Sequence, residues 1–276
     1  MSGMLSIVPT PIGNLGDITF RGVETLKNAD IIAAEDTRRT KILLGHYQID
    51  TPLISYHEHN EYKRTPELLK RIENGEHVAL VSDAGTPSVS DPGYRLVFAA
   101  LEKSLPVTAL PGASAILPAL VVSGFPTDSF VFLGFLPRKK GERRKKLEEV
   151  ATFTYTAVFF ESPNRVKAVL SECKSILGDR KVAICRELTK KFEEIKRGKI
   201  SEILKEIPEK LKGEITIAIA PGEKEPISWA EVEEEIKKML SEGKGVKEIA
   251  TLIHESTDLS KREVYSRALK LKSMLD

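Results

Sequence analysis

The sequence predicts an α/β protein of two domains, followed by a small unit of three helices. Apolar, β-branched runs of strand length alternate with helical patterns from the start of the chain, which is the rhythm of a largely parallel sheet. After the turn at 126–128 a second such series begins, richer in Phe, Glu and Lys, and after Pro226 three helical patterns follow one another. We therefore expect domains at 1–116, 117–224 and 225–276.

In the first domain, the spacing of apolar residues separates helices from strands. Phe20, Val23 and Leu26 recur at helical spacing and share one face of an expected helix. Short runs of Ile, Val and Ala between such patterns have the length of buried strands. The expected strands are 5–9, 31–34, 77–81 and 106–110, and the expected helices are 18–28, 66–74 and 93–103.

In the second domain, a short charged segment at 192–200 indicates a hairpin and therefore a mixed sheet. In the tail, Ser228 and Ser260 stand at N-cap positions, each with a glutamate three residues later, which is the pattern of a capping box. The expected strands are 130–135, 156–161, 182–186 and 214–220, and the expected helices are 145–150, 165–177, 229–240, 245–254 and 260–275.

The composition argues against several classes of protein. The longest apolar runs fall far short of the roughly 20 residues that cross a bilayer, and no basic-then-apolar signal opens the chain, so we expect a cytoplasmic protein without a membrane partner. Cys173 and Cys185 lack CxxC spacing, which argues against a disulfide framework or a zinc site. The His-Glu-His segment at 57–59 offers only two ligands, so we expect no metal.

Three turns rich in Gly and Pro follow expected strands, at 9–17, 82–93 and 110–115. In an open α/β sheet, ligands bind beyond the carboxyl ends of the strands, where glycine permits close approach and proline stiffens the loop. The first turn lacks G-x-G-x-x-G, and the chain has no G-x-x-x-x-G-K-[ST] phosphate loop. The turns therefore predict one ligand site that does not serve a nucleotide di- or triphosphate.

Long motifs lie in and around these turns. They are VPTPIGNLGDIT (8–19), AAEDTRRT (33–40), SYHEHNE (55–61), LVSDAGTPSVSDPG (80–93), ALPGASA (109–115), GFLPRKKGER (134–143) and FFESPNR (159–165). With these motifs the chain resembles the tetrapyrrole-methylase-like superfamily of S-adenosylmethionine enzymes. Within that superfamily it is most similar, from about 5 to 221, to the small-subunit (16S) ribosomal RNA cytidine 2′-O-methyltransferases. The residues from 228 onward are similar to a helix-turn-helix-type tail on this branch.

The resemblance implies a two-domain tetrapyrrole-methylase-like fold with S-adenosylmethionine in the cleft between the domains. It implies transfer of a methyl group to a cytidine ribose in 16S ribosomal RNA, with the small ribosomal subunit as partner and a homodimer as the assembly. Whether Asp83 or Thr86 holds the polar groups of the cofactor stays open. The cofactor residues that the resemblance implies are Ile12, Asp83, Gly85, Thr86, Val89, Ser114, Ala115 and Phe160.

Three acidic residues are candidates for the general base of such a reaction. Glu35 and Asp36 directly follow the expected strand 31–34, and Glu161 ends the strand 156–161. A positioned base contributes ~10²–10⁴-fold to the rate. For each acid the alternative is a helix N-cap or an ion pair with a nearby arginine, and the sequence does not decide between them.

A basic run at 138–146 holds seven cations and one anion. By itself it would be a solvated helix face, but beside a resemblance to RNA-modifying enzymes it predicts contacts with phosphates. A methylase of a small tetrapyrrole, which has no use for this run, and a non-catalytic RNA-binding assembly factor are the alternative functions. The expected RNA-binding residues are Arg138, Lys139, Lys140, Arg143, Arg144, Lys145 and Lys146.

Overall fold

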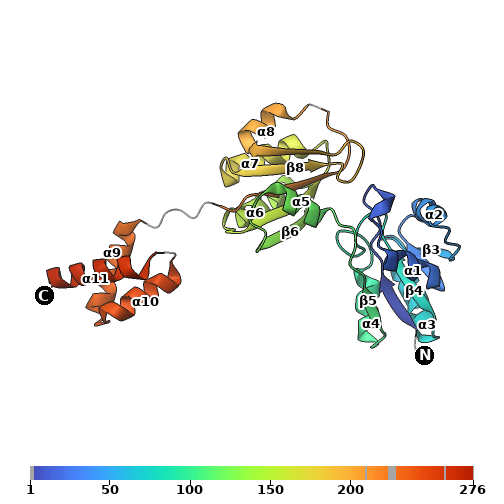
Figure 1. Ribbon diagram of the computed structural model, residues 1–276, viewed down its shortest axis with the longest axis horizontal. Coiled ribbons are helices and arrows are strands. Elements are labelled where there is room, and N and C mark those ends of the chain that lie inside the picture. The colour runs from blue at the N-terminus through green and yellow to red at the C-terminus, as the bar shows by residue number, and fades with distance from the viewer. Residues whose placement is uncertain (1–2, 209, 223–227, 258, 276) are drawn as a thin grey trace. The chain divides into compact units, whose positions relative to one another are not determined.

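The first sheet is built from the N-terminal part of the chain and is entirely parallel (Figure 1). The computed structural model describes residues 3–208, 210–222, 228–257 and 259–275. The strand order is β3-β2-β4-β1-β5, so the first strand of the chain lies between β4 and β5. The strands are β1 (Met4–Ile7), β2 (Ile31–Ala34), β3 (Leu53–Ser55), β4 (His77–Val81) and β5 (Val107–Ala109).

Helices cover both faces of this sheet, which is why its strands are continuous apolar runs. Successive residues point to opposite faces: Ala33 and Leu80 belong to the core with α3 (Glu61–Glu73) and α4 (Tyr94–Glu102). Ala34 and Val81 belong to the core with α1 (Phe20–Asn28) and α2 (Thr37–His46). A single turn of 3-10 helix, Leu15–Asp17, precedes α1.

The second sheet is mixed, as the sequence predicts. Its order is β6-β7-β10-β8-β9, and the hairpin expected from the charged segment is the antiparallel pair of β8 and β9. Only β6 and β7 run parallel. The strands are β6 (Phe130–Phe135), β7 (Thr156–Glu161), β8 (Lys181–Arg186), β9 (Glu194–Lys199) and β10 (Ile215–Ile219).

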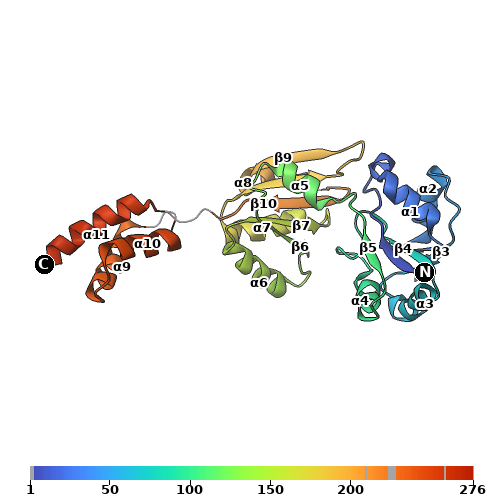
Figure 2. The ribbon, with the colours of Figure 1, turned by 60° about the horizontal axis from the view of Figure 1, so that its bottom comes forward.

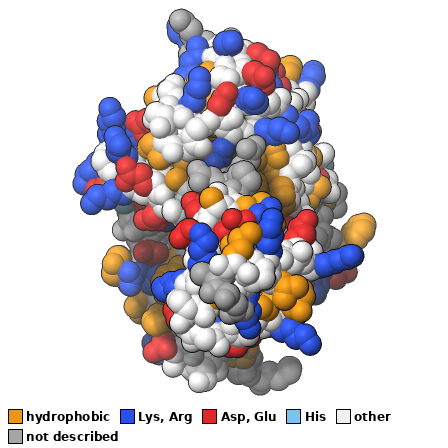
Figure 3. All heavy atoms as spheres, turned by 90° about the vertical axis from the view of Figure 1, so that its left-hand side faces the viewer, with side chains coloured by type: hydrophobic (Ala, Val, Ile, Leu, Met, Phe, Trp, Pro, Cys, Tyr) orange, Lys and Arg blue, Asp and Glu red, His pale blue; other side chains and the backbone are white. Residues whose placement is uncertain are grey.

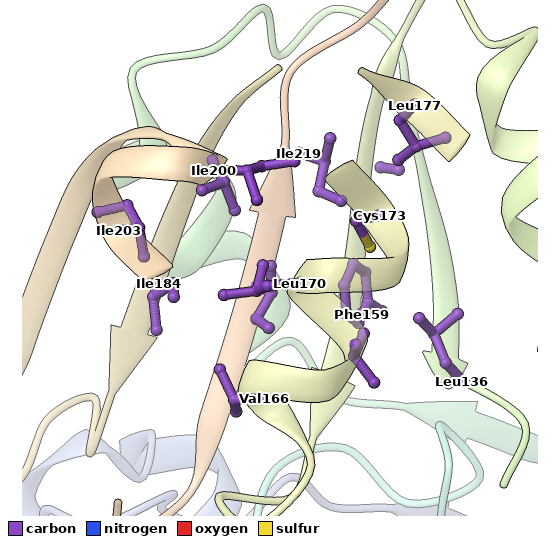
Figure 4. Close-up of a cluster of buried hydrophobic side chains, with 14 of the residues drawn as sticks. Leu136, Phe159, Val166, Leu170, Cys173, Leu177, Ile184, Ile200, Ile203 and Ile219 are labelled. Atoms are coloured by element: carbon purple, nitrogen blue, oxygen red, sulfur yellow. The ribbon is translucent and has the colours of Figure 1, made fainter. Parts of the chain in front are cut away.

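Helices cover both faces of the second sheet (Figure 2), and alternation along its strands divides the second core into two layers. The small side chains Ala183 and Ala218 pack with Leu120 of α5 (Ile116–Ser123) on one face. The larger Phe159 and Ile184 point to the other face. There α7 places Leu170 and Cys173 among the strand residues, and α8 adds Ile200 and Ile203 (Figure 4). The helices of this face are α6 (Lys140–Ala151), α7 (Val166–Leu177) and α8 (Ile200–Glu206).

The tail forms three helices with a core of its own. They are α9 (Trp229–Ser241), α10 (Val246–Ser256) and α11 (Lys261–Leu275), close to the three expected helices. Val232, Ile249 and Val264 meet in this core. The hydroxyl of Ser228 accepts a hydrogen bond from the backbone N–H of Ala230 and so caps α9 as expected.

The chain divides into two compact units, Met1–Gly222 and Glu223–Asp276, and the first holds both sheets. The expected boundary at 224/225 lies outside the described residues. The boundary at 116/117 falls at the start of α5, which packs on the second sheet. No helix in the described part of the chain combines the length and the apolarity that a bilayer span requires.

The sequence-based expectations miss several short elements. The sequence does not predict helices α2, α5 and α8, of seven to ten residues, or strand β3, of three residues, because elements this short hold too few apolar positions to establish a period. Helix α3 begins at Glu61, five residues before the expected start at Pro66. Pro66 therefore lies inside the helix and does not open it, although proline is most common at the first helical position.

Candidate functional site

The three Gly/Pro-rich turns meet at one edge of the first sheet. They follow β1, β4 and β5, which are neighbours in the order β4-β1-β5, so their carboxyl ends lie side by side. Thr10 in the first turn and Gly85 in the second form an isolated bridge. The hydroxyl of Thr10 also donates to the carbonyl oxygen of Ser82 at 2.9 Å. The three turns thus lie together at one edge of the sheet, as expected for strands that are neighbours.

A pocket of about 360 Å³, here called the first pocket, lies against these turns. Residues of the second sheet complete it, including Phe135 of β6, Phe160 of β7 and the segment from Gly213 to Thr216. Its volume is within the range of small-molecule sites. From the expected cofactor set, the pocket lining includes Ile12, Gly85, Thr86, Val89, Ser114, Ala115 and Phe160.

The first pocket is apolar and carries only negative ionisable groups. Asp91, Glu161 and Glu214 line it, and no Lys, Arg or His is among its lining residues. Glu161 and Glu214 are paired with Arg165 and Lys190, so Asp91 is the lining carboxylate without a cation partner within 4 Å among the described residues. This carboxylate and the apolar lining suit a ligand with apolar parts and positive charge. This agrees with the absence of phosphate-binding motifs in the sequence.

Asp83, the remaining member of the expected cofactor set, does not line the first pocket. One of its carboxylate oxygens, Oδ1, accepts from the backbone N–H of Asp36 at 2.9 Å, and Oδ2 lies 3.3 Å from a guanidinium nitrogen of Arg39. Its carboxylate thus joins the turn after β4 to the turn after β2. Thr86 does line the pocket, and its hydroxyl donates to the carbonyl of Ala113 at 3.3 Å. Of the two alternatives, only Thr86 is among the residues that line the pocket.

A second pocket of about 810 Å³ adjoins the first. Ser90 and Asp91 line both, so the two cavities share one wall. The second pocket is lined by Glu35, His57, Glu58, His59, Glu61, Ser90, Asp91, Pro92, Gly93, Tyr94, Arg95 and Phe98. Within the described ranges, no group of three or more His, Cys, Asp or Glu residues is arranged to hold a metal ion.

Asp91, in the shared wall, was not among the expected site residues. Burial, followed by the nearby charge of Glu35, raises the pKa of its carboxyl from 3.8 to about 6. The available signal was an acid next to Pro92 and Gly93 in a turn that already pointed to a ligand. The sequence gives no reason to prefer Asp91 over Asp83, because the partial burial of Asp91 comes from residues distant in the chain.

The turn that carries Asp91 is strained. Ser88 and Ser90 both adopt positive φ values, 72° and 65°, which residues other than glycine seldom take. Gly93, which ends the turn, has a φ of 139°. Backbone strain of this kind persists only where the surrounding structure imposes it, and it concentrates at functional sites.

Glu35 is the only expected base that lines the second pocket. Its Oε2 accepts a hydrogen bond of 3.3 Å from the backbone N–H of Asp83. Burial of the carboxyl raises its pKa above 4.5, although this hydrogen bond opposes the shift. A carboxylate with a raised pKa beside a cavity is suited to accept a proton near neutral pH.

The other two expected bases are held in ion pairs, which was the stated alternative. Asp36 caps α2 and binds Arg38 through both carboxylate oxygens, at 3.0 and 2.7 Å; these bonds hold its pKa well below the usual range. Glu161 lines the first pocket, but its side chain is fully buried. One of its oxygens accepts from the backbone N–H of Ser162 at 2.7 Å, and the other lies 3.3 Å from Arg165.

Arg143 is the exception within the basic run. It is only 8% exposed, and its guanidinium donates twice to Glu172, both at 2.7 Å, and also to the carbonyls of Pro137 and Arg138. It therefore fastens α6 to α7, and the expectation that it contacts RNA is wrong for this structure. Residues three or four positions apart lie on the same face of a helix, and the buried residues of α6 are Arg143, Leu147 and Val150.

The other six cations of the run lie at the surface or partly exposed. Lys139, Arg144 and Lys146 pair with glutamates of the same helix. No carboxylate of the described residues pairs with Arg138, Lys140 or Lys145. On the face drawn in Figure 3, Lys and Arg are interspersed with Asp and Glu, in keeping with a net charge of +2. Any positive charge that this run offers to RNA therefore comes from Arg138, Lys140 and Lys145 and not from the charge of the whole protein.

Comparisons with known proteins identify the family of the chain. The family model for tetrapyrrole (corrin/porphyrin) methylases matches residues 4–204. The chain is 45% identical over 271 residues to "Ribosomal RNA small subunit methyltransferase I" of Halalkalibacterium halodurans, a match that covers 96% of this chain and 94% of that protein.

Solved structures with lower sequence identity share the fold. The methyltransferase CobJ aligns with a TM-score of 0.61 and 19% identity, over 80% of this chain and 95% of its own. A uroporphyrin-III C-methyltransferase from Thermus thermophilus, solved in complex with S-adenyl homocysteine, aligns with a TM-score of 0.54 and 17% identity, over 78% and 96% of the two chains. Identities this low support the α/β fold and nothing finer.

Proposed function

Because the chain belongs to the tetrapyrrole (corrin/porphyrin) methylase family, we propose that it transfers a methyl group from S-adenosylmethionine to the 2′-hydroxyl of a cytidine in 16S ribosomal RNA. The observation that carries this proposal is the near-complete match to a ribosomal RNA small subunit methyltransferase, beside a pocket built from the expected cofactor turns. The protein then works in the cytoplasm, as a homodimer, on the small ribosomal subunit.

The first pocket has the chemistry that this cofactor requires. S-adenosylmethionine carries a sulfonium, an ammonium and a carboxylate, so its net charge is positive, and the charged residues that line the pocket are all acidic. Ile12, Val89 and Phe160 supply apolar cover, while Thr86 and Ser114 supply polar groups. When bound, the cofactor supplies an electrophilic methyl group.

Asp91 has a specific role in this arrangement. Ionising its carboxyl is costly because the group is largely withdrawn from water, and a neighbouring cation lowers that cost. In the wall between the pockets, Asp91 stabilises the positive charge of the cofactor and orients it toward the second pocket.

Glu35 accepts the proton that the ribose hydroxyl loses as its oxygen gains the methyl group. It lines the second pocket together with Asp91, and its raised pKa brings its proton affinity closer to that needed at neutral pH. Asp36 and Glu161 keep structural roles: Asp36 caps α2, and Glu161 fixes the turn that begins at Ser162.

The decisive experiment uses purified small ribosomal subunits that lack the modification. The protein and S-adenosylmethionine with an isotopically labelled methyl group are added, and the RNA is digested to nucleosides for mass spectrometry. The expected product is 2′-O-methylcytidine. Label in a base, or transfer to a porphyrinoid but not to RNA, would overturn the proposal. Cofactor binding without transfer to either substrate would support the non-catalytic alternative.

A further inference from the structure

The second pocket carries a pair of exposed aromatic rings that the methyl-transfer chemistry does not use. Tyr94 and Phe98 lie one helical turn apart on α4, and both line the pocket. They are 70% and 51% exposed, whereas Leu96 and Ala100 of the same helix are buried in the core. Large aromatic side chains that stay in water beside a cavity favour a ligand with apolar, planar parts.

The two rings already form the beginning of a stack. Their centroids are 5.9 Å apart, and their planes differ by 24°. Close by, the guanidinium of Arg95 lies 3.5 Å from the ring centre of Tyr62, and a nitrogen of the same group lies 3.2 Å from Glu61. This second pair holds α4 against α3. The Tyr94–Phe98 pair is therefore presented on a rigid support.

Some carboxylates of the second pocket are already paired with a basic side chain, and others are not. Glu61 pairs with Arg95, and Glu58 lies 3.3 Å from His59. Glu35 and Asp91 have no cation partner within 4 Å among the described residues. Acidic side chains repel phosphates but accept hydrogen bonds from the amino groups of bases and from hydroxyls. The pocket thus suits the base and ribose of a nucleotide better than its phosphate.

On these grounds we propose that the Tyr94–Phe98 pair is a stacking platform for an unpaired nucleobase of the RNA substrate, at or next to the methylated nucleotide. The inference rests on the proposed function and names the subsite that positions its substrate. Aromatic side chains commonly hold splayed-out bases of single-stranded RNA in this way. The shared wall at Ser90 and Asp91 places the platform beside the cofactor pocket.

The test removes the rings and keeps the bulk. Tyr94→Leu and Phe98→Leu should each weaken binding of a short single-stranded target RNA by about 5- to 150-fold, the loss expected for one stacked base. Tyr94→Phe should bind as the parent protein does, because it keeps the ring. Phe20→Leu is the matched control, since Phe20 is 94% exposed on α1 and lines neither pocket. S-adenosylmethionine affinity should be unchanged in all four variants.

A second measurement asks whether a base, and not another group, occupies the platform. Abasic sites are introduced one at a time across the target RNA. One abasic RNA should bind the parent protein more weakly than intact RNA does, by the factor that Tyr94→Leu costs with intact RNA. The Tyr94→Leu variant should bind this abasic RNA and the intact RNA equally well. If the loss from every abasic site multiplies with the loss from Tyr94→Leu, the base and the ring do not interact, and the proposal is overturned. Unchanged RNA affinity in both leucine variants would also overturn it, and so would a change in oligomeric state as their only effect, because a second copy of the chain would then cover the rings.

The two proposals fail in distinguishable ways. If the parent protein methylates no RNA, the proposed function fails. If it does, and the leucine variants keep the RNA affinity and KM of the parent, only the platform fails. Direct evidence of stacking comes from Tyr94→Trp combined with Trp229→Phe, which removes the single native tryptophan. Its fluorescence should be quenched by the target RNA, and the abasic RNA identified above should not quench it.

Discussion

The backbones of Thr10 and Gly85 exchange two hydrogen bonds: the N–H of Thr10 donates to the carbonyl of Gly85 at 2.9 Å, and the N–H of Gly85 donates to that of Thr10 at 2.8 Å. These bonds join the turn after β1 to the turn after β4. The bridge holds Gly85 at a φ of 80°, in the left-handed region that favours glycine. The shape of the first pocket depends on this pairing, because Ile12, two residues after Thr10, and Thr86, directly after Gly85, both line the pocket.

Gly85→Val should therefore weaken S-adenosylmethionine binding at least tenfold. The conformation costs a side chain about 1–2 kcal/mol, and a branched side chain adds bulk next to Ile12, whose Cγ2 would be 3.5 Å from the new Cβ. Isothermal titration calorimetry measures the loss. Gly45→Ala is the control, since its Cβ would meet nothing within 4 Å, and it should leave the affinity unchanged. Equal affinity in Gly85→Val would mean that this turn does not contact the cofactor.

Asp91→Asn should stabilise the protein against heat at neutral pH while weakening cofactor binding. Because the pKa of Asp91 is raised from 3.8 to about 6, its contribution to stability is fully present below 3.8 and is lost as the pH rises through about 6. Asparagine never ionises, so the variant should melt at a higher temperature than the parent at pH 8, and the difference should vanish toward pH 4. Thermal unfolding between these two values, with calorimetry at pH 7.5, checks both effects. Stabilisation without loss of affinity would remove Asp91 from the cofactor site.

Glu35→Gln should lower turnover by ~10²–10⁴-fold and leave cofactor affinity near that of the parent. In the parent protein the rate should rise with pH until Glu35 is ionised and then level off, at a pKa above 4.5. This rise of the rate with pH should be absent from Glu35→Gln. The matched control is Asp36→Asn, because asparagine also caps helices well, and it should keep most of its activity. If the control loses as much turnover as Glu35→Gln, the assignment of the base is wrong.

Changing Arg138, Lys140 and Lys145 together to alanine should weaken RNA binding and flatten its dependence on salt. Each phosphate contact releases counterions and contributes roughly 0.7–0.9 log units of affinity per tenfold change in salt. Filter binding at several salt concentrations gives the slope. The choice of nucleotide should not change, because phosphate contacts do not read bases.

The control for this triple variant removes three exposed cations from helices α1 and α3. They belong neither to the basic run nor to the lining of either pocket, so the dependence of RNA affinity on salt should match that of the parent protein. A slope unchanged in both triple variants would point to the tail as the RNA anchor. The control residues are Arg21, Lys27 and Lys70.

Arg143→Ala should act on stability instead of on RNA. Glu172 would lose both of its hydrogen bonds from Arg143 but is itself only partly buried, so the loss of stability should be about 1–3 kcal/mol. Arg143 lowers the pKa of Glu172, so this contribution is present above 4.5 and is lost as the pH falls through the lowered pKa. Urea unfolding should therefore show a large deficit at pH 7 and a smaller one in acid. A deficit in RNA affinity without a deficit in stability would contradict the burial of this side chain.

Much of the fold could be predicted from the chain because its signals are local. Strands β2, β4, β6 and β7 have the expected bounds, since short runs rich in Ile, Val, Ala, Leu or Phe between turn signals are typical of strands. Short elements such as α2 and β3 were missed, because their conformation is set by packing against neighbours that the local sequence does not reveal.

The sequence by itself determined that three Gly/Pro-rich turns would follow strands, and parallel strands place such turns at one edge. The tertiary structure alone decided what the charged residues do there. Asp83 and Asp91 stand in the same turn, yet one binds Arg39 and the other lies in the wall between two pockets, because burial and partners depend on residues distant in the chain. Arg143 and Arg144 are neighbours in sequence, but the helix turns the first toward Glu172 and the second toward solvent.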